Sequence, residues 1–157
     1  MVKNFFSYVF ELIKVVAVSL AIIIPVRYYL IQPFYVKGAS MEPNFYDKEY
    51  LIIDEISYRF HEPVRGDIIV FRYPRNPEEY FIKRVIALPG EKAQIKDGSA
   101  YIYNQANPQG LKLEETYLPA GDKTYGLNEE IITLGANEYY VLGDNRNSSK
   151  DSRSFGP

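Results

Sequence analysis

The sequence contains no cysteine and no tryptophan, and it has one histidine among its 157 residues. Without cysteine, the chain has no disulfide, no thiolate nucleophile and no cysteine-type metal site. A Ser-His-Asp triad would have to use His61, and a metal site built from several histidines is excluded. His61 lies in a segment with turn signals, and the carboxylates show no metal-ligand spacing. We therefore expect no histidine base, no metal and no cofactor.

The chain also has little net charge, because 18 lysines and arginines face 20 aspartates and glutamates, giving −2 at pH 7. This balance gives no reason to expect nucleic acid as a partner. Hydrophobic residues make up 46% and charged residues 24% of the chain, which is ordinary for a globular protein with a core. The aromatic residues, among them 15 tyrosines, favour strands over helices.

Charge is missing altogether from residues 15–26, inside a mostly apolar segment that runs from about residue 9 to residue 31. As a helix, this segment would be ~30–35 Å long, which spans the hydrocarbon core of a bilayer. We expect an uncleaved membrane anchor. A cleavable secretory signal and a buried core helix are the alternatives. The basic residues on the two sides of the segment are balanced, so they do not determine its orientation.

Beyond residue 50, apolar runs are short and are separated by turn signals, with a hairpin turn expected at Asp97-Gly98. No helical period longer than about ten residues is found there. The sequence therefore predicts a mainly β fold, an antiparallel β-sheet domain behind one N-terminal transmembrane helix. We place the anchor and its preceding end in residues 1–31 and the β-rich domain in residues 32–157. Residues 104–128 are the least patterned part and are expected to leave the main sheets.

One predicted strand, residues 80–88, carries Lys83 and Arg84 side by side within an apolar run. In an extended strand the two side chains point to opposite faces, so each needs its own partner. A solvated lysine at a sheet edge is one interpretation. The other is a lysine desolvated by Phe81, Ile82 and Met41, whose pKa then falls toward the range of a general base.

A long polar segment follows the predicted strand that ends at Leu142. Residues 143–153 are all polar or small, and they interleave two aspartates and two arginines with serines. A plain solvated loop is one interpretation. The other is a rigid loop that ties itself together through carboxylate–guanidinium pairs and supports a site. The residues concerned are Asp144, Arg146, Asp151 and Arg153.

Four stretches occur in a fixed order after the apolar segment: "GASMEP", "RGDIIVF", "FIKRVIALPGE" and "GDNRNSSKDSR". Together they resemble the bacterial type I signal peptidases, and the resemblance runs from about residue 31 to the end of the chain. It implies a membrane-bound serine endopeptidase that removes N-terminal signal peptides from exported preproteins. Ser-Lys pairs are among the known variants of serine catalysis.

The resemblance implies a role for individual residues. Ser40 would attack the scissile carbonyl with Lys83 as the general base, and the Ser40 backbone N–H would donate to the oxyanion. Ser149 would orient Lys83, and the four charged residues of the polar loop would hold that loop. Some family members carry a serine where this chain has Gly38, and its hydroxyl completes the oxyanion hole. The second donor therefore stays unassigned here.

The resemblance also implies the substrate and the place of action. Phe34, Val36, Met41 and Ile82 would line two shallow apolar pockets that select Ala-x-Ala before the cut. The partners would be signal-peptide-bearing preproteins and the lipid bilayer, with the catalytic domain on the extracytoplasmic side of the bacterial cytoplasmic membrane. The nucleophile would lie near the membrane surface, where anchoring of both partners raises their effective concentration.

Family members usually continue beyond the final "SFGP" with a further strand, so we expect this chain to be truncated at its C-terminus. Two alternative functions stay open at this point. One is a self-cleaving repressor-type protease with the same Ser-Lys chemistry, which would lack a membrane anchor. The other is a membrane-tethered β domain that binds peptides without cleaving them, in which Lys83 would be solvated.

Overall fold

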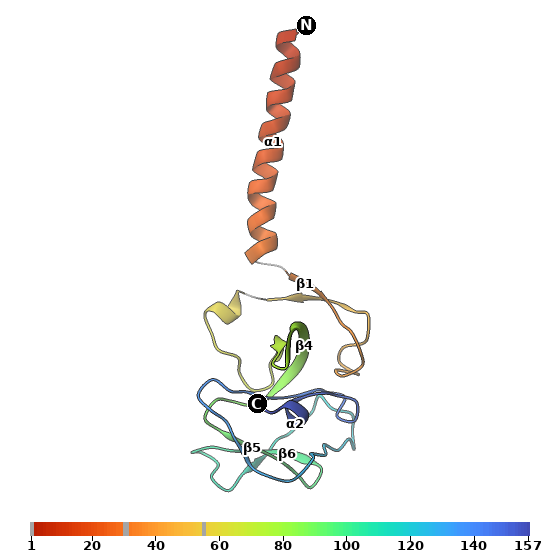
Figure 1. The fold of residues 1–157 in the computed structure, drawn as a ribbon, viewed down its shortest axis with the longest axis vertical. Helices are drawn as coiled ribbons and strands as arrows, with labels where there is room; N and C mark the ends of the chain where they lie inside the picture. Colours follow the sequence, from red (N-terminus) through yellow and green to blue (C-terminus); the bar gives the residue numbers. More distant parts are fainter. Residues whose placement is uncertain (1, 30–31, 55) are drawn as a thin grey trace. The chain divides into compact units, whose positions relative to one another are not determined.

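A computed structural model describes residues 2–29, 32–54 and 56–157 and divides the chain into two compact units (Figure 1). The first unit contains Met1–Phe34 and Tyr50–Glu62, and the second contains Tyr35–Glu49 and Pro63–Pro157. The boundary predicted between residues 31 and 32 falls beside residues 30–31, which lie outside the described residues. That boundary stays a prediction.

The first unit is dominated by one long helix, α1 (Val2–Tyr29). Its stretch Phe5–Arg27 has a mean hydropathy of 2.4, and none of its most apolar window is buried. A core helix would be mostly buried, so that alternative is wrong. The length and composition of α1 fit a single-pass membrane anchor. The predicted end of the anchor, Ile31, lies outside the described residues.

Short elements follow α1. Strand β1 (Gln32–Tyr35) pairs with β2 (Tyr50–Ile53) in a two-stranded sheet, and a 3-10 turn, η1 (Ser57–Arg59), comes after β2. The apolar run predicted from residue 50 to residue 60 is thus a strand of only four residues followed by a turn. Asp54 ends the strand, because its carboxylate accepts hydrogen bonds from the backbone N–H of Ile56 and of Ser57.

The second unit contains two antiparallel sheets, and the predicted fold class is confirmed. One has the order β3-β4-β9 and the other the order β7-β6-β5-β8. The bounds are β3 (Ile68–Tyr73), β4 (Asn76–Ala87), β5 (Lys92–Lys96), β6 (Ser99–Tyr103), β7 (Leu111–Lys112), β8 (Ile132–Thr133) and β9 (Tyr140–Leu142). Asp97 and Gly98 form the predicted hairpin turn, with φ of 50° and 71°.

Strand β4 is the central strand of its sheet and positions the site. It begins at Asn76, four residues earlier than the sequence predicts, because a tight turn at Pro74-Arg75 pairs its start with β3. From Lys83 to Ala87 every residue is buried, which explains why Val85, Ile86 and Ala87 are apolar on both faces of the strand. The core continues from β4 through β9 into β5 and β6, with Ile86, Leu142, Ala93 and Ile102 among its residues.

Two elements late in the second unit were not predicted. Strand β7 lies within the unpatterned residues 104–128, where its two residues pair with β6. A short helix, α2 (Ser152–Phe155), ends the polar loop and is capped by the Asp151 side chain, which accepts from the Arg153 backbone N–H. Both elements are too short to leave a periodic signal in the sequence.

Candidate active site

Ser40 and Lys83 lie side by side in the second unit. Lys83 Nζ is 2.8 Å from Ser40 Oγ and donates to the Ile82 carbonyl oxygen at 2.7 Å. Lys83 exposes only 3% of its surface, although it is a lysine. The alternative of a solvated edge lysine is therefore wrong for this structure, because the amine lies within the packed sheet and against a hydroxyl.

Burial changes the proton affinity of this amine. It lowers the Lys83 pKa from its usual 10.5 to about 8, and the negative charges of Asp151 and Asp144 oppose the shift. Part of the apolar environment comes from Phe81, two residues away on the same face of β4. Its ring centroid lies 5.2 Å from Nζ, and the ring stacks on Tyr73. About one tenth of Lys83 is therefore neutral at pH 7, far more than of a free lysine.

The segment before Ser40 is held by local hydrogen bonds. Gly38 adopts a φ of +87°, which favours glycine, and its backbone N–H donates to Asp47 Oδ1 at 2.7 Å. That N–H is therefore engaged and is not offered to an oxyanion beside Ser40. The Asp47 bond fixes the chain two residues before the hydroxyl.

Asn145, a residue of the polar loop, also holds this segment. Its backbone N–H donates to the Ser40 carbonyl oxygen at 3.0 Å, and its side-chain amide donates to the Ala39 carbonyl oxygen at 3.0 Å. Asn145 was not among the site residues predicted from the sequence. The available signal was its place within the stretch "GDNRNSSKDSR".

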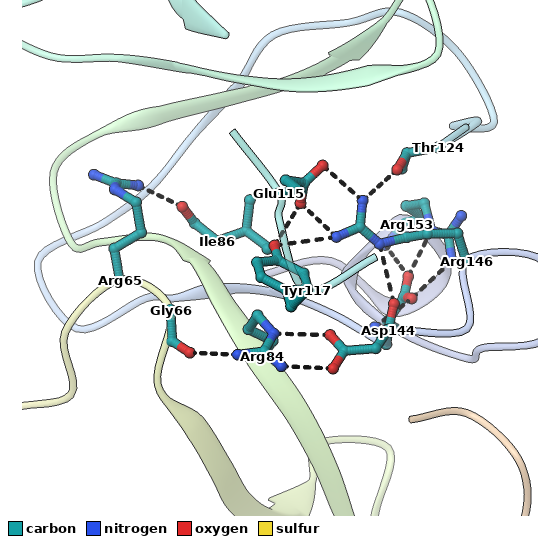
Figure 2. A network of polar contacts seen from close by, with 12 residues as sticks. Arg65, Gly66, Arg84, Ile86, Glu115, Tyr117, Thr124, Asp144, Arg146 and Arg153 are labelled. Carbon is teal, nitrogen blue, oxygen red and sulfur yellow. Dashed lines mark hydrogen bonds and ion pairs between the residues drawn. The ribbon is translucent and has the colours of Figure 1, made fainter. Parts of the chain in front are cut away.

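Arg84, the neighbour of Lys83, faces the other side of β4 and pairs with Asp144 (Figure 2). The contact is bidentate, with Nε to Oδ1 at 2.8 Å and Nη2 to Oδ2 at 2.6 Å. Arg84 also donates to the Gly66 carbonyl oxygen at 2.8 Å. Asp144 is completely buried, so this pair fixes the start of the polar loop against the strand that carries Lys83.

Arg146 does not pair within the polar loop, which differs from our expectation. Both of its terminal nitrogens bind the carboxylate of Glu115, and it also bonds the hydroxyl of Thr124 (Figure 2). Burial alone would lower the pKa of Arg146, but its bonds to Glu115 raise it. The predicted excursion, residues 104–128, supplies this partner, and sequence alone could not place it there.

Asp151 and Arg153 form the one expected pair within the loop, with Oδ1 to Nε and Oδ2 to Nη2 both at 2.8 Å. Asp151 is completely buried and also accepts from the Gly143 backbone N–H at 3.0 Å. Ser152, which was not predicted, accepts from the Val141 backbone N–H at 3.0 Å. The Ser152 side chain thus binds the backbone of β9, and the Asp151 side chain binds that of Gly143, the residue after β9.

Ser149 does not bond to Lys83 in this structure. Among the described residues, its Oγ is a buried hydroxyl without a hydrogen-bond partner, while Lys83 Nζ is engaged with Ser40 and Ile82. Ser149 instead packs over Gly143, where a Cβ on the glycine would meet Ser149 Cβ at 2.5 Å. The expected orienting bond is absent, and the role of Ser149 toward Lys83 stays a prediction.

The profile of the family described as "Signal peptidase, peptidase S26" matches residues 9–157. The chain belongs to this signal peptidase family. The resemblance inferred from the four stretches is thereby confirmed, and so is the assignment to a peptidase family.

Curated relatives agree with this assignment. The chain is 38% identical over 153 residues to signal peptidase I of Leptolyngbya laminosa, covering 93% of this chain and 71% of that protein. It is 35% identical over 152 residues to probable signal peptidase I-2 of Synechocystis sp., covering 93% of this chain. The chain spans 65% of the length of that relative. A solved signal peptidase I from Enterococcus faecalis V583 has a TM-score of 0.48 at 34% identity, covering 61% of this chain and 88% of that one.

The stretches shared with this family also have structural roles outside the Ser40–Lys83 pair. Arg65 of "RGDIIVF" binds both carboxylate oxygens of Glu91, the last residue of "FIKRVIALPGE", at 2.7 and 2.8 Å. Glu91 also accepts from the Leu88 backbone N–H, which closes the turn after β4. Burial alone would raise the pKa of Glu91. The hydrogen bonds that its carboxylate accepts, first of all from Arg65, lower the pKa below its ordinary value. These residues shape the sheet rather than the reactive pair.

The four residues predicted to line substrate pockets fall in both units. Phe34 is half-buried on β1 in the first unit, and the other three lie in the second. Val36 exposes 5% and Met41 only 1% of its surface, while Ile82 is half-buried beside Lys83. Met41 and Val36 are therefore also part of the packed interior. Their role toward a substrate stays a prediction.

Proposed function

We propose that this chain is a membrane-anchored serine endopeptidase that removes signal peptides from exported preproteins, with Ser40 as nucleophile and Lys83 as general base. The observation that carries the proposal is the 2.8 Å separation of Ser40 Oγ and Lys83 Nζ at a buried amine whose pKa falls to about 8. Membership of the signal peptidase family and relatives of that name support the preprotein as substrate.

The reaction is acyl transfer. When Lys83 is neutral, the Ser40 hydroxyl donates its hydrogen bond to the amine and transfers its proton as Oγ attacks the scissile carbonyl. The resulting ammonium then supplies the proton that the leaving amine requires. The neutral amine next takes a proton from the water that hydrolyses the ester between Ser40 and the signal peptide. The Ser40 backbone N–H is proposed as an oxyanion donor.

Specificity follows from small apolar subsites. We assign Val36, Met41 and Ile82 to pockets that accept alanine side chains, and Phe34 to the same set on the sequence resemblance. Because such pockets are shallow, larger side chains before the cut are rejected by steric clash rather than by lost hydrogen bonds. The preferred substrate is an extended Ala-x-Ala segment.

The direct test is cleavage of a purified preprotein with an Ala-x-Ala site by the chain in detergent micelles. The parent, Ser40→Ala and Lys83→Met are compared, with Lys112→Met as the control for loss of an exposed lysine. We expect cleavage at the alanine by the parent and the control and by neither site variant. Equal cleavage by all four proteins would exclude the Ser40–Lys83 pair, and cleavage by none of them would favour a tethered domain that binds peptides without cutting them.

We further propose that α1 crosses the membrane once and that the second unit lies on the extracytoplasmic side. Because the chain has no cysteine, a single cysteine is an unambiguous probe. Asn137→Cys places it at an exposed turn of the second unit. A membrane-impermeant maleimide is expected to label this variant in intact spheroplasts. Labelling only after lysis contradicts the orientation.

A further inference from the structure

Asn44 joins three parts of the second unit that are far apart in sequence. Its side-chain amide nitrogen donates to Asp144 Oδ2 at 2.8 Å and to the Tyr117 carbonyl oxygen at 3.0 Å. An amide nitrogen carries two hydrogens, so these two bonds use its whole donor capacity. Although Asn44 is exposed as a residue, one of its acceptors is a completely buried carboxylate.

Asn44 belongs to the turn that begins at Ser40. Backbone hydrogen bonds close this turn, from Glu42 N–H to the Ala39 carbonyl oxygen and from the N–H groups of Asn44 and Phe45 to the Met41 carbonyl oxygen. A turn closed in this way moves as a unit. A contact at Asn44 therefore constrains the position of Ser40, four residues earlier.

The turn is held at both ends by consecutive residues of the polar loop. Asn145 binds the carbonyl oxygens of Ala39 and Ser40 at the near end, and Asp144 binds Asn44 at the far end. Without Asn44 the turn keeps its near-end contacts and the Gly38–Asp47 bond. It loses its direct attachment to the buried carboxylate of Asp144.

Asp144 connects this turn to the strand that carries the base. Its two oxygens accept from Arg84 in a bidentate contact, and Arg84 is the immediate neighbour of Lys83 on β4. The path from Ser40 to Lys83 through Asn44, Asp144 and Arg84 consists of hydrogen bonds of 2.6 to 2.8 Å and short covalent segments. It fixes both reacting atoms to one buried carboxylate.

We propose that Asn44 is a positioning residue that holds the nucleophile turn at reacting distance from Lys83 by binding Asp144. The inference rests on the proposed Ser40–Lys83 chemistry. The Asn44 side chain bonds to Asp144 and Tyr117 and not to the reacting atoms of Ser40 and Lys83. Its contribution is the geometry of Oγ relative to Nζ, and a displacement of about 1 Å at such a site lowers a rate by about 100-fold.

The test compares Asn44→Ala, which deletes both donors, with Asn44→Asp, which keeps the shape and places a carboxylate against that of Asp144. Asn137→Ala and Asn137→Asp are the matched controls at an exposed turn. We expect kcat for preprotein cleavage to fall about 10-fold in Asn44→Ala and further in Asn44→Asp, with KM within about twofold of the parent. The controls are expected to match the parent.

A second readout separates positioning from peptide binding and from folding. This readout is the rate at which a small activated ester acylates Ser40. The rate is divided by the amount of folded protein, which near-ultraviolet circular dichroism measures. We expect it to fall in the variants by the same factor as kcat. Values within twofold of the parent for both Asn44 variants overturn the inference. A variant whose KM rises while its kcat is unchanged also overturns the inference. So does a fall in activity that equals the fraction of the variant that is unfolded.

Failure of the proposed function is distinguishable from failure of this inference. If the parent and Ser40→Ala cleave the preprotein equally, the function fails. The inference is then tested by crystal structures of the parent and Asn44→Asp. A lengthened Oγ–Nζ distance in the variant supports it, and an unchanged distance of 2.8 Å overturns it.

Discussion

The guanidinium group of Arg84 lies over the ring of Tyr117, with Cζ 3.9 Å from the ring centroid. Arg146 approaches the same ring, at 6.0 Å, and the Tyr117 hydroxyl donates to Glu115 at 2.6 Å. Burial, followed by the bond to Glu115, raises the pKa of this hydroxyl above its ordinary range. Residues 115–117, in the least patterned part of the sequence, thus contact Arg84 and Arg146, which belong to two of the four stretches that suggested the family (Figure 2).

Replacing Tyr117 tests how much the ring stabilises this arrangement. Tyr117→Phe removes the hydroxyl, and Tyr117→Leu removes both hydroxyl and ring. The difference between the two variants therefore reports the ring over Arg84. We expect Tyr117→Leu to lower the free energy of unfolding by about 1–2 kcal/mol more than Tyr117→Phe, measured by urea denaturation in detergent. Equal losses would mean that the stacked cation contributes nothing.

Glu115→Gln tests the ion pair with Arg146. The substitution keeps the shape of the side chain but leaves the fully buried guanidinium of Arg146 without a counter-charge. We expect a loss of about 3–5 kcal/mol in the free energy of unfolding. Glu114→Gln, at the exposed neighbouring residue, is the matched control and is expected to change stability by less than about 0.5 kcal/mol. A small loss in Glu115→Gln contradicts the buried pair.

The lowered pKa of Lys83 predicts the pH dependence of cleavage. Because the proposed base must be neutral, kcat/KM is expected to rise with pH about tenfold per unit below pH 8 and to level off above it. At pH 7 about one tenth of the maximal value remains, since about one tenth of the amine is neutral. The rate of cleavage measured against pH at limiting preprotein gives the profile of kcat/KM, and the same series at saturating preprotein gives that of kcat. A midpoint near 10.5, the usual lysine value, would contradict a desolvated base.

The same pKa shift predicts how stability depends on pH. The folded-state pKa of Lys83 is about 8 and the unfolded-state value 10.5, so between these values the unfolded chain binds the extra proton. The contribution of Lys83 to the free energy of unfolding therefore rises with pH across this window, by about 3 kcal/mol in all. Comparing the parent with Lys83→Met at pH 8 and pH 10.5 isolates this contribution, because the raised pKa values of Tyr117 and Tyr140 affect both proteins alike. The difference in free energy of unfolding between parent and variant is expected to change in favour of the parent at the higher pH, and a constant difference contradicts the shift.

Gly143→Ala tests the packing around Ser40 and Ser149. A Cβ at residue 143 would overlap Ser149 Oγ and the Ser40 carbonyl oxygen, so the turn or the loop must shift. We expect cleavage to fall at least 10-fold, in line with a displaced nucleophile. Gly121→Ala is the control, because a Cβ there meets nothing within 4 Å and costs only the strain of its φ of +88°. Activity in Gly143→Ala equal to that of the control would contradict the crowding.

Local sequence patterns determined most of the fold. The apolar stretch predicted the helix, alternation and turn residues predicted the antiparallel sheets, and Asp97-Gly98 fixed one hairpin through their positive φ angles. These features are local because each depends on residues a few positions apart. The short β7 and α2 escaped prediction because two and four residues carry no usable period.

The sequence alone determined the family, through four ordered stretches, and it named Ser40 and Lys83 as a reactive pair. Only the tertiary structure decided that their atoms lie 2.8 Å apart and that the lysine is buried. It also decided that Arg146 pairs with Glu115 and that Asn44 reaches Asp144, 100 residues away. The physical reason is that charge pairs and desolvation depend on which segments the packing of strands brings together, and neither leaves a periodic mark along the chain.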